Sequence, residues 1–369
     1  MKYYLIAGEA SGDLHGANLI KAIRKNDPQA ELRCWGGDLM EASGATLVKH
    51  YRDLAFMGFV EVLLNIHTIL RNISFCKSDI KEFQPDVIIL IDYPGFNLRI
   101  APFAKALGIK VIYYISPQVW AWKQSRVRLI RRVVDRMLVI LPFEEEFYAK
   151  FNYQVDYVGH PLLDAIKEYK EKGVPKKLQF DRPVIALLPG SRKQEIKAML
   201  PLMVAVSQSF PAYQFVVASA PNVDEAYFSN YLQGTDIKWV KHSTYDLLHA
   251  AHAALVTSGT ATLETALFKT PQVVCYKGST ISVAIARRLI KVDYISLVNL
   301  IMKKEVVKEL IQQSLTEDNM CKELALISEG THREKMLEAY NQLEGILSEG
   351  GASEKAAAII NEELKRNHE

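Results

Sequence analysis

Short apolar runs alternate with longer segments of helical pattern along most of this chain, and this alternation restricts its fold more than any other feature. Such alternation is typical of βαβ units built around a parallel sheet. We therefore expect an α/β fold. The expected strands are Tyr3–Ala7, Glu31–Trp35, Val87–Ile91, Val111–Ile115, Met137–Ile140, Val155–Val158, Val184–Leu188, Gln214–Ala218, Ile237–Val240, Ala254–Thr257 and Val273–Tyr276.

The alternation is interrupted by a charged stretch with Gly and Pro between residues 165 and 182, a composition typical of linkers. The expected organisation is an N-terminal domain over residues 1–164, a linker over 165–182, a second domain over 183–340 and a helical tail over 341–369. Strands are expected to stop at Val283. The tail can dock on either half, the N-terminal domain being one of the two options.

Charge and cysteine content exclude several classes of protein. The 369 residues carry 45 Lys and Arg against 42 Asp and Glu, a formal charge of +3, and a dedicated nucleic-acid binder is usually strongly basic. The four cysteines lie far apart without a C-x-x-C pair, which favours free thiols in a reducing cytoplasm. The N-terminus runs directly into an expected strand and lacks the apolar length of a signal peptide.

Ligands of a doubly wound sheet bind outside the carboxyl ends of its strands, so the residues after each strand matter most. The first such segment contains Glu9, Ser11, Asp13 and His15 among small residues. It matches neither the dinucleotide nor the P-loop pattern, but its small residues let a substrate approach the backbone. His15 is a candidate general base, with packing in the first helical turn as the alternative. Ser11 or Asp13 can instead cap the helix.

A second candidate segment follows the apolar strand at residues 87–91, which delivers Asp92 to the same edge of the sheet. A carboxylate in this place can accept the proton of an alcohol nucleophile. Pro94 and Gly95 then force a turn, with Asn97 just beyond it. A capping or turn role for Asp92 remains the structural alternative.

Two segments of the second half are suited to anions. The first is Pro189-Gly190-Ser191-Arg192, in which a glycine, a hydroxyl and a planar guanidinium open a helix. The second is Ser258-Gly259-Thr260, with Glu264 about one turn later. A helix start with hydroxyls favours a diphosphate, and Glu264 can accept hydrogen bonds from two sugar hydroxyls. Simple helix capping is the alternative for both segments.

Two further stretches indicate contact with a membrane surface. Phe59–Phe75 is the most apolar segment, but its 17 residues fall short of the roughly 20 that span a bilayer. We expect a helix that either presents apolar side chains to lipid or is buried in the core. Trp122–Arg136 is rich in Lys and Arg, and Arg128, Arg132 and Arg136 recur every four positions. Such a basic face suits anionic headgroups or a substrate phosphate, or is simply solvated.

Together with other motifs, these segments resemble the lipid-A-disaccharide synthases, glycosyltransferases of the two-Rossmann-domain (GT-B) type. The resemblance covers nearly the whole chain. It rests on the four segments around Gly8, Asp92, Arg192 and Ser258, and also on Ser116-Pro117-Gln118-Val119-Trp120-Ala121-Trp122, Leu141-Pro142-Phe143-Glu144, Gly159-His160-Pro161 and Asp293–Leu300. It implies two Rossmann-like domains that face a cleft.

The resemblance also implies a reaction and a set of roles. A 2,3-diacylglucosamine unit would pass from its UDP-activated form to the 6-hydroxyl of 2,3-diacylglucosamine 1-phosphate with inversion, releasing UDP, in lipid A and lipopolysaccharide synthesis. Asp92 would be the base and Arg192 would steady the nucleotide phosphates, with Gly190, Ser191, Ser258, Gly259, Thr260, Glu264 and Asn299 also at the UDP moiety. The acceptor or sugar would meet Glu9, Ser11, His15, Asn97, Arg128 and Arg132.

The resemblance implies no metal and no cofactor, because the acidic residues of the motifs are isolated and form no D-x-D pair. It implies a cytoplasmic enzyme at the cytoplasmic face of the inner membrane, in contact with its lipids. Two rival functions remain: another UDP-sugar enzyme of this architecture, such as a UDP-N-acetylglucosamine 2-epimerase, and a non-catalytic membrane-surface protein that binds nucleotide sugars. Whether Asp92 or His15 is the base, and which oligomer forms, stay open.

Overall fold

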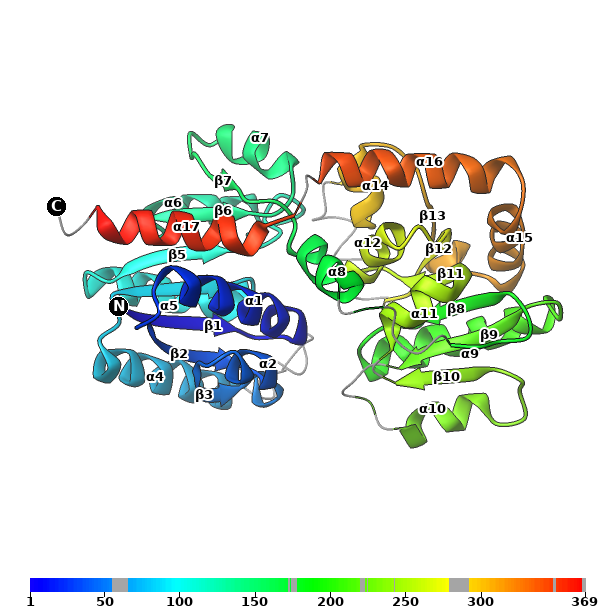
Figure 1. The fold of residues 1–369 in the computed structure, drawn as a ribbon, viewed down its shortest axis with the longest axis horizontal. Helices are drawn as coiled ribbons and strands as arrows, with labels where there is room; N and C mark the ends of the chain where they lie inside the picture. Colours follow the sequence, from blue (N-terminus) through cyan, green and yellow to red (C-terminus); the bar gives the residue numbers. More distant parts are fainter. Residues whose placement is uncertain are drawn as a thin grey trace. The chain divides into compact units, whose positions relative to one another are not determined.

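The computed structural model of the chain describes residues 1–54, 66–171, 173, 178–219, 223, 225–241, 243–278, 292–347 and 350–366 (Figure 1). The chain divides into two compact units, one formed by Met1–Asp164 with Glu349–Glu369 and the other by Ala165–Ser348. Each unit is built around one parallel sheet. The expected α/β fold class with two Rossmann-like halves is therefore confirmed.

The first unit contains a seven-stranded sheet in the order β3-β2-β1-β4-β5-β6-β7. Its strands are β1 (Lys2–Ala7), β2 (Glu31–Gly36), β3 (Thr46–His50), β4 (Val87–Ile91), β5 (Lys110–Tyr114), β6 (Arg136–Val139) and β7 (Asp156–Tyr157). Its helices are α1 (Ala10–Asn26), α2 (Asp38–Ala42), α4 (Ile66–Phe83), α5 (Pro94–Ala106), α6 (Val127–Val133), α7 (Phe143–Ala149) and α17 (Ala352–Lys365), with 3₁₀ turns η1 (Tyr51–Asp53) and η2 (Gln124–Arg126). The strand order reverses between β1 and β4.

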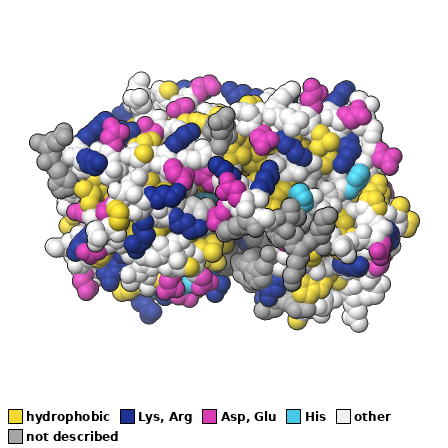
Figure 2. Space-filling view, in the orientation of Figure 1, with side chains coloured by type: hydrophobic (Ala, Val, Ile, Leu, Met, Phe, Trp, Pro, Cys, Tyr) yellow, Lys and Arg dark blue, Asp and Glu magenta, His cyan; other side chains and the backbone are white. Residues whose placement is uncertain are grey.

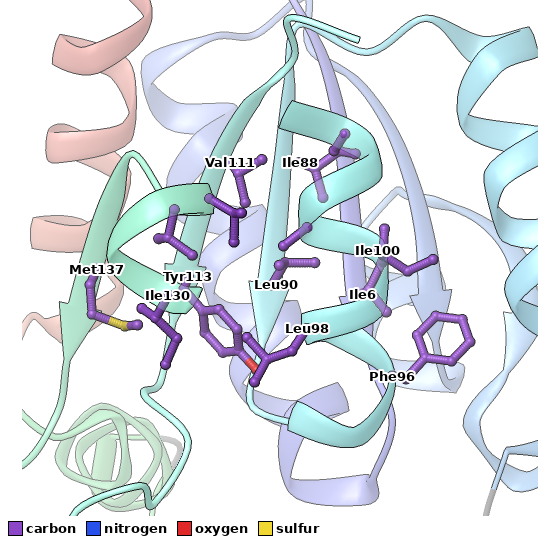
Figure 3. Packing of buried hydrophobic residues seen from close by; sticks show 14 of the residues in the cluster. Ile6, Ile88, Leu90, Phe96, Leu98, Ile100, Val111, Tyr113, Ile130 and Met137 are labelled. Carbon is purple, nitrogen blue, oxygen red and sulfur yellow. The ribbon is translucent and has the colours of Figure 1, made fainter. Parts of the chain in front are cut away.

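The core of the first unit explains why its central strands read as continuous apolar runs. Every residue of β4 is buried, as expected for a parallel strand that is covered on both faces. On one face, Ile88, Leu90 and Val111 pack together with side chains from α5 and α6 (Figure 3). Tyr113 lies in the same cluster, and its hydroxyl reaches toward the end of the sheet where the loops begin.

The last helix, α17, belongs to the first unit, where it packs against α1 (Figure 1). The carboxylate of Asp164 accepts hydrogen bonds from the backbone N–H groups of Gly351 (2.6 Å) and Ser353 (3.1 Å). An ion pair of 2.9 Å joins Lys110 on β5 to Glu363. The C-terminal helix thus completes the core of the unit that contains the N-terminus.

The second unit contains a six-stranded sheet in the order β10-β9-β8-β11-β12-β13, which reverses between β8 and β11. Its strands are β8 (Val184–Leu188), β9 (Gln214–Ser219), β10 (Lys238–Lys241), β11 (Ala251–Thr257), β12 (Gln272–Tyr276) and β13 (Lys308–Ile311). Its helices are α9 (Lys193–Gln208), α10 (Glu225–Leu232), α11 (Thr244–Ala250), α12 (Thr260–Leu267), α14 (Leu297–Met302), α15 (Glu317–Ser328) and α16 (Thr331–Ile346), with a 3₁₀ turn η3 (Gln312–Ser314).

Several boundaries differ from those expected. Helix α8 (Pro161–Glu171) runs into the expected linker, and residue 341 falls inside α16, so the tail separates only after Ser348. Strand β13 lies beyond Val283, where no strand was expected, and β3 was also missed. Both are edge strands with few fully buried side chains, and edge strands often carry the polar residues that hide the strand pattern.

The surface carries both signs of charge. Lys and Arg side chains are interspersed with Asp and Glu on the face shown in Figure 2. This mixture agrees with the small formal charge of +3. Cys34, Cys76 and Cys275 are buried free thiols, and Cys321 is half-buried.

Candidate functional site

The candidate site of the first unit lies where its strand order reverses. Strands β1 and β4 are hydrogen-bonded neighbours, and Ala7 at the end of β1 stands opposite Ile91 at the end of β4. The next residues, Gly8 and Asp92, therefore leave the sheet side by side at its carboxyl edge, and Glu9 follows Gly8 close to Asp92. This topological switch point is where open α/β sheets bind their ligands.

Asp92 combines an unusual backbone with an unusual acidity. Its φ angle is +44° and that of Tyr93 is +47°, both in the left-handed region that costs non-glycine residues energy. Burial raises the pKa of the Asp92 carboxyl to about 7; the nearby Glu9 carboxylate adds to the rise, and a hydrogen bond from the Tyr93 backbone opposes it. A carboxyl with this pKa is suited to proton transfer near neutral pH.

The backbone at Asp92 is held by two buried side chains. The Tyr113 hydroxyl donates to the Asp92 carbonyl at 2.5 Å, and the Asn97 amide donates to it at 2.7 Å. Asn97 is fully buried and also bonds the Ile91 carbonyl, at 3.3 Å. The sequence predicted Asn97 as a contact of the acceptor or sugar. In the structure its Nδ2 holds the backbone that carries Asp92, while its Oδ1 has no hydrogen-bond partner among the described residues.

The loop after β1 is shaped by packing. A Cβ on Gly8 would lie 2.3 Å from the ring of Tyr93, so this glycine lets the loop approach the turn after β4. Asp13 is buried and caps α2, since its carboxylate accepts from the N–H groups of Gly37, Leu39 and Met40 at 2.8 to 3.1 Å. Ser11 is exposed and makes no cap, so it stays available to a ligand.

His15 lies in a buried pair of histidines. Its side chain is 5% exposed and its Nδ1 has no hydrogen-bond partner within the described ranges. Burial lowers the pKa of His15 to about 4, and burial followed by the proximity of His15 lowers the pKa of His160 to about 3. Both imidazoles are therefore neutral at pH 7. Of the two candidate bases, Asp92 and His15, His15 is the weaker.

The loop after β5 contains the Ser116–Trp122 motif and is anchored from inside. The Ser116 hydroxyl and the Tyr148 hydroxyl are 2.7 Å apart, and Trp120 packs edge-on against Phe143 at 5.0 Å between ring centroids. The buried Glu144 accepts from the N–H groups of Ile140 and Leu141, at 3.2 and 3.0 Å. Sequence reasoning assigned no role to Glu144, although its motif was visible.

The basic segment after this loop is less regular than its spacing predicted. Helix α6 ends at Val133, so Arg136 does not extend the stripe of Arg128 and Arg132. Arg136 lies on β6 and forms a bidentate pair with Asp156, at 3.0 and 2.8 Å. Arg128 and Arg132 are exposed. The expected basic helix face thus consists of two arginines on a short helix.

The second unit repeats this arrangement at its own switch point, between β8 and β11. Gly190 has φ +113°, and a Cβ there would lie 2.7 Å from the Cβ of Glu195. The Glu195 carboxylate accepts from the backbone N–H groups of Ser191 (3.0 Å) and Arg192 (3.3 Å) and pairs with the Arg192 guanidinium at 3.1 Å. An internal carboxylate therefore sits at the anion-favouring start of α9.

Helix α12 begins beside this segment. Gly259 and Thr260 are exposed at its N-terminus, which favours an anion, and the Ser258 hydroxyl donates to the Ile295 carbonyl at 3.2 Å. Glu264 is half-buried one turn later and accepts from the Tyr245 hydroxyl at 3.4 Å. Burial raises the pKa of Glu264 to about 7, and the bond from Tyr245 opposes the rise.

Asn299 was predicted at the nucleotide or sugar, but its amide is fully used inside the protein. The side chain is completely buried. Its Nδ2 donates to the Val307 carbonyl and the Glu309 carboxylate, and its Oδ1 accepts from the N–H groups of Val306 and Val307, all at 2.7 to 2.9 Å. Glu309 also accepts from Ile295 and Ser296 at 2.9 Å. Asn299 therefore orders the loop that Ser258 contacts.

Across the described ranges, no group of three His, Cys, Asp or Glu side chains has the arrangement of a metal site. None of the helices in the part of the chain that the structure describes is long and apolar enough to cross a membrane. The N-terminal part of the expected apolar helix, residues 59–65, lies outside the described residues.

Comparison with known proteins assigns this arrangement to a family. The profile of the lipid-A-disaccharide synthetase family matches residues 3–362. The chain belongs to the lipid-A-disaccharide synthase family. The lipid-A-disaccharide synthase of Syntrophus aciditrophicus is 40% identical, over 98% of both chains. That of Myxococcus xanthus is 39% identical, over 98% of this chain and 97% of its own.

Solved structures share the fold of this chain. UDP-GlcNAc 2-epimerase from Neisseria meningitidis, bound to UDP-GlcNAc, has a TM-score of 0.69 at 15% identity and covers 99% of this chain and 100% of its own. The glycotransferase of kitacinnamycin has a TM-score of 0.66 at 12% identity, over 98% of both chains. At these identities the likeness concerns the fold alone, which is the GT-B architecture that the sequence predicted.

Proposed function

We propose that the chain transfers 2,3-diacylglucosamine from UDP-2,3-diacylglucosamine to the 6-hydroxyl of 2,3-diacylglucosamine 1-phosphate. The products are the β-1,6 disaccharide 1-phosphate and UDP. Membership of a glycosyltransferase family of lipid A biosynthesis supports this reaction. The observation that carries it is the pair of switch points, because one holds a carboxyl with a pKa near 7 and the other holds an arginine beside two helix N-termini.

Asp92 acts as the general base in this proposal. Inversion requires one in-line displacement, in which the acceptor hydroxyl loses its proton as it attacks the anomeric carbon. The pKa of Asp92 is about 7 and that of His15 about 4, so Asp92 binds the transferred proton far more strongly. Glu9 contributes by keeping the Asp92 pKa high, and the exposed Ser11 is free to bond the acceptor.

The second unit holds the donor. The exposed N-terminus of α12 at Gly259 and Thr260 receives the diphosphate, and Glu264 receives the ribose hydroxyls. Arg192 leaves its pair with Glu195 to meet the phosphates, which stabilises the charge that develops on the departing UDP. No metal is needed in this scheme, because the guanidinium and the helix N-termini supply the positive charge.

The acyl chains of both substrates bring the enzyme to the cytoplasmic face of the inner membrane. On α4, Ile73, Cys76 and Ile80 are buried, whereas Leu70 and Phe75 are 53% and 48% exposed. Exposed apolar side chains of this size favour insertion between lipid headgroups. Serine at positions 70 and 75 is therefore expected to lower binding to vesicles, and unchanged binding would contradict this part of the proposal.

Product analysis tests the reaction. The purified chain is incubated with synthetic UDP-2,3-diacylglucosamine and 2,3-diacylglucosamine 1-phosphate, and the products are identified by mass spectrometry. We expect the disaccharide 1-phosphate and UDP in equal amounts, and UDP only when the acceptor is present. UDP release or epimerisation without acceptor would favour the 2-epimerase alternative. Nucleotide binding without turnover would favour a binding protein.

A further inference from the structure

Two cations share one exposed aromatic ring at the carboxyl edge of the first unit's sheet. Trp122 is 39% exposed. The Lys123 Nζ lies 4.6 Å from its ring centroid, and the Arg126 guanidinium carbon lies 5.5 Å from it. Each contact is a favourable cation–π interaction, but the two like charges repel each other across the ring.

Neither cation is neutralised by the protein. Among the described residues, neither Lys123 nor Arg126 forms an ion pair with a carboxylate. Neighbouring basic residues of the same unit behave differently, because Lys105 pairs with Asp135 and Arg136 pairs with Asp156. A half-buried guanidinium beside a second uncompensated cation favours a bound anion, which would relieve the repulsion between them.

The local backbone keeps the two cations together. Lys123 has φ +54°, and its carbonyl accepts from the Arg126 N–H at 3.0 Å, which closes the turn that starts η2. The Gln124 amide donates to the Trp120 carbonyl at 3.4 Å and ties this turn to the Ser116–Trp122 motif. The pair therefore lies on a fixed turn.

This turn follows β5, the strand next to the one that delivers Asp92. Burial raises the pKa of Tyr113 well above 10, and Arg126 is among the charges that oppose this rise. The Tyr113 hydroxyl in turn bonds the Asp92 carbonyl. Arg126 thus lies near the Tyr113 hydroxyl, which contacts the backbone of the proposed base.

We infer that Lys123 and Arg126, stacked on Trp122, form a subsite for an anionic phosphate group. The inference rests on the proposed function, in which the acceptor carries a phosphate on C1 and reacts through the hydroxyl on C6. The guanidinium offers a planar fork that matches phosphate oxygens, and the ammonium adds a second positive charge. The phosphodiester of an anionic lipid headgroup is the other source of negatively charged phosphate oxygens.

Kinetics with two acceptors test the inference. UDP release is measured with 2,3-diacylglucosamine 1-phosphate and with the same lipid lacking the phosphate, for wild type, Arg126→Ala and Lys123→Ala. We expect each variant to lower kcat/KM about 10- to 100-fold for the phosphorylated acceptor and to leave the other acceptor nearly unaffected. Arg366→Ala, an exposed arginine of the same unit, is the charge-matched control. Equal losses on both acceptors would overturn an acceptor-phosphate subsite.

Two binding measurements separate the sources and remain valid if the proposed transfer fails. Inorganic phosphate is titrated while indole fluorescence is followed, with Trp122→Phe identifying the signal of Trp122. Binding to vesicles of phosphatidylglycerol is compared with binding to phosphatidylcholine. A phosphate-dependent Trp122 signal that Arg126→Ala abolishes supports the subsite. If Arg126→Ala and Lys123→Ala lose only the binding to phosphatidylglycerol vesicles, the subsite is assigned to lipid headgroups. The inference is overturned if the variants show no acceptor-specific loss of kcat/KM, no loss of the Trp122 signal and no loss of phosphatidylglycerol binding. Absence of product with wild type contradicts only the transfer reaction.

Discussion

The hydroxyl of Tyr113 donates a hydrogen bond of 2.5 Å to the backbone carbonyl of Asp92. This bond ties the end of β5 to the left-handed turn after β4, where φ of Asp92 is +44°. The surrounding core therefore stabilises a strained backbone at the residue proposed as the base, as is common in active sites. The backbone conformation of Asp92 thus depends on Tyr113, which is buried in the core.

Replacing the carboxylate tests the proposed base. Asp92→Asn keeps the shape of the side chain but removes its proton affinity, so we expect kcat to fall about 10²- to 10⁴-fold. UDP affinity, measured by calorimetry, is expected to stay unchanged because the nucleotide is proposed to bind to the other unit. His15→Gln serves as the comparison. A larger loss of kcat in His15→Gln than in Asp92→Asn would identify His15 as the base.

The raised pKa of Asp92 predicts the pH profile. Because the base must be deprotonated, turnover is expected to rise with pH and to level off above about 7. Glu9→Gln removes a neighbouring negative charge, which lowers the Asp92 pKa and moves the acidic limb of the profile to lower pH. Rate measurements between pH 5 and 9 check both expectations. An acidic limb that does not move in Glu9→Gln would contradict this coupling.

Arg192 is expected to stabilise the leaving group and not the fold. It is about half exposed and its pair with Glu195 is a surface interaction, so Arg192→Ala should cost only about 0.5 kcal/mol of stability. We expect kcat/KM to fall about 100-fold or more, since a positive charge at the departing phosphates is lost. Arg192→Lys should recover part of this loss. Thermal melting of both variants measures the change in stability, and steady-state kinetics measure the change in kcat/KM.

Asn299 is expected to be structural. Asn299→Ala leaves two backbone N–H groups, a carbonyl and the Glu309 carboxylate without their partner, at a cost of about 2 to 4 kcal/mol. Urea unfolding should register this loss, together with weaker UDP binding at temperatures near the transition. If the variant kept full stability and lost only UDP binding, this result would instead support the direct nucleotide contact predicted from the sequence.

Glu144 makes stability depend on pH in an unusual direction. Burial raises its pKa to about 7, while backbone N–H groups of Leu141 and Ile140 partly oppose the rise. The folded state thus binds a proton more tightly than the unfolded state, so the free energy of unfolding falls as pH rises from about 4.5 to about 7. In Glu144→Gln the fall in the free energy of unfolding between low and high pH should be smaller by up to about 3 kcal/mol. Urea unfolding at pH 5 and pH 8 measures the difference.

The alternation of apolar runs and helical segments was sufficient to predict most strands of both sheets. It also predicted the edge of the first sheet at which Asp92 lies and the edge of the second at which Arg192 and Ser258 lie. This success follows from parallel sheets themselves, whose buried strands must be apolar and whose carboxyl ends must share one edge. Of the four edge strands in the described part of the chain, β3 and β13 were missed, whereas β7 and β10 were predicted although they have no fully buried residue.

The sequence by itself determined the fold class, the family and the segments that carry polar chemistry, because these depend on local periodicity and on motifs that are contiguous in the chain. Only the tertiary structure decided what each polar side chain does. Asp13 and Asn97 come after strands just as ligand-binding residues do, yet their partners are backbone groups. Asn299 on α14 likewise bonds the backbone of Val306 and Val307, and also the Glu309 carboxylate. Hydrogen-bond partners and burial are set by contacts between distant segments, and those contacts also raise the pKa of Asp92 to about 7.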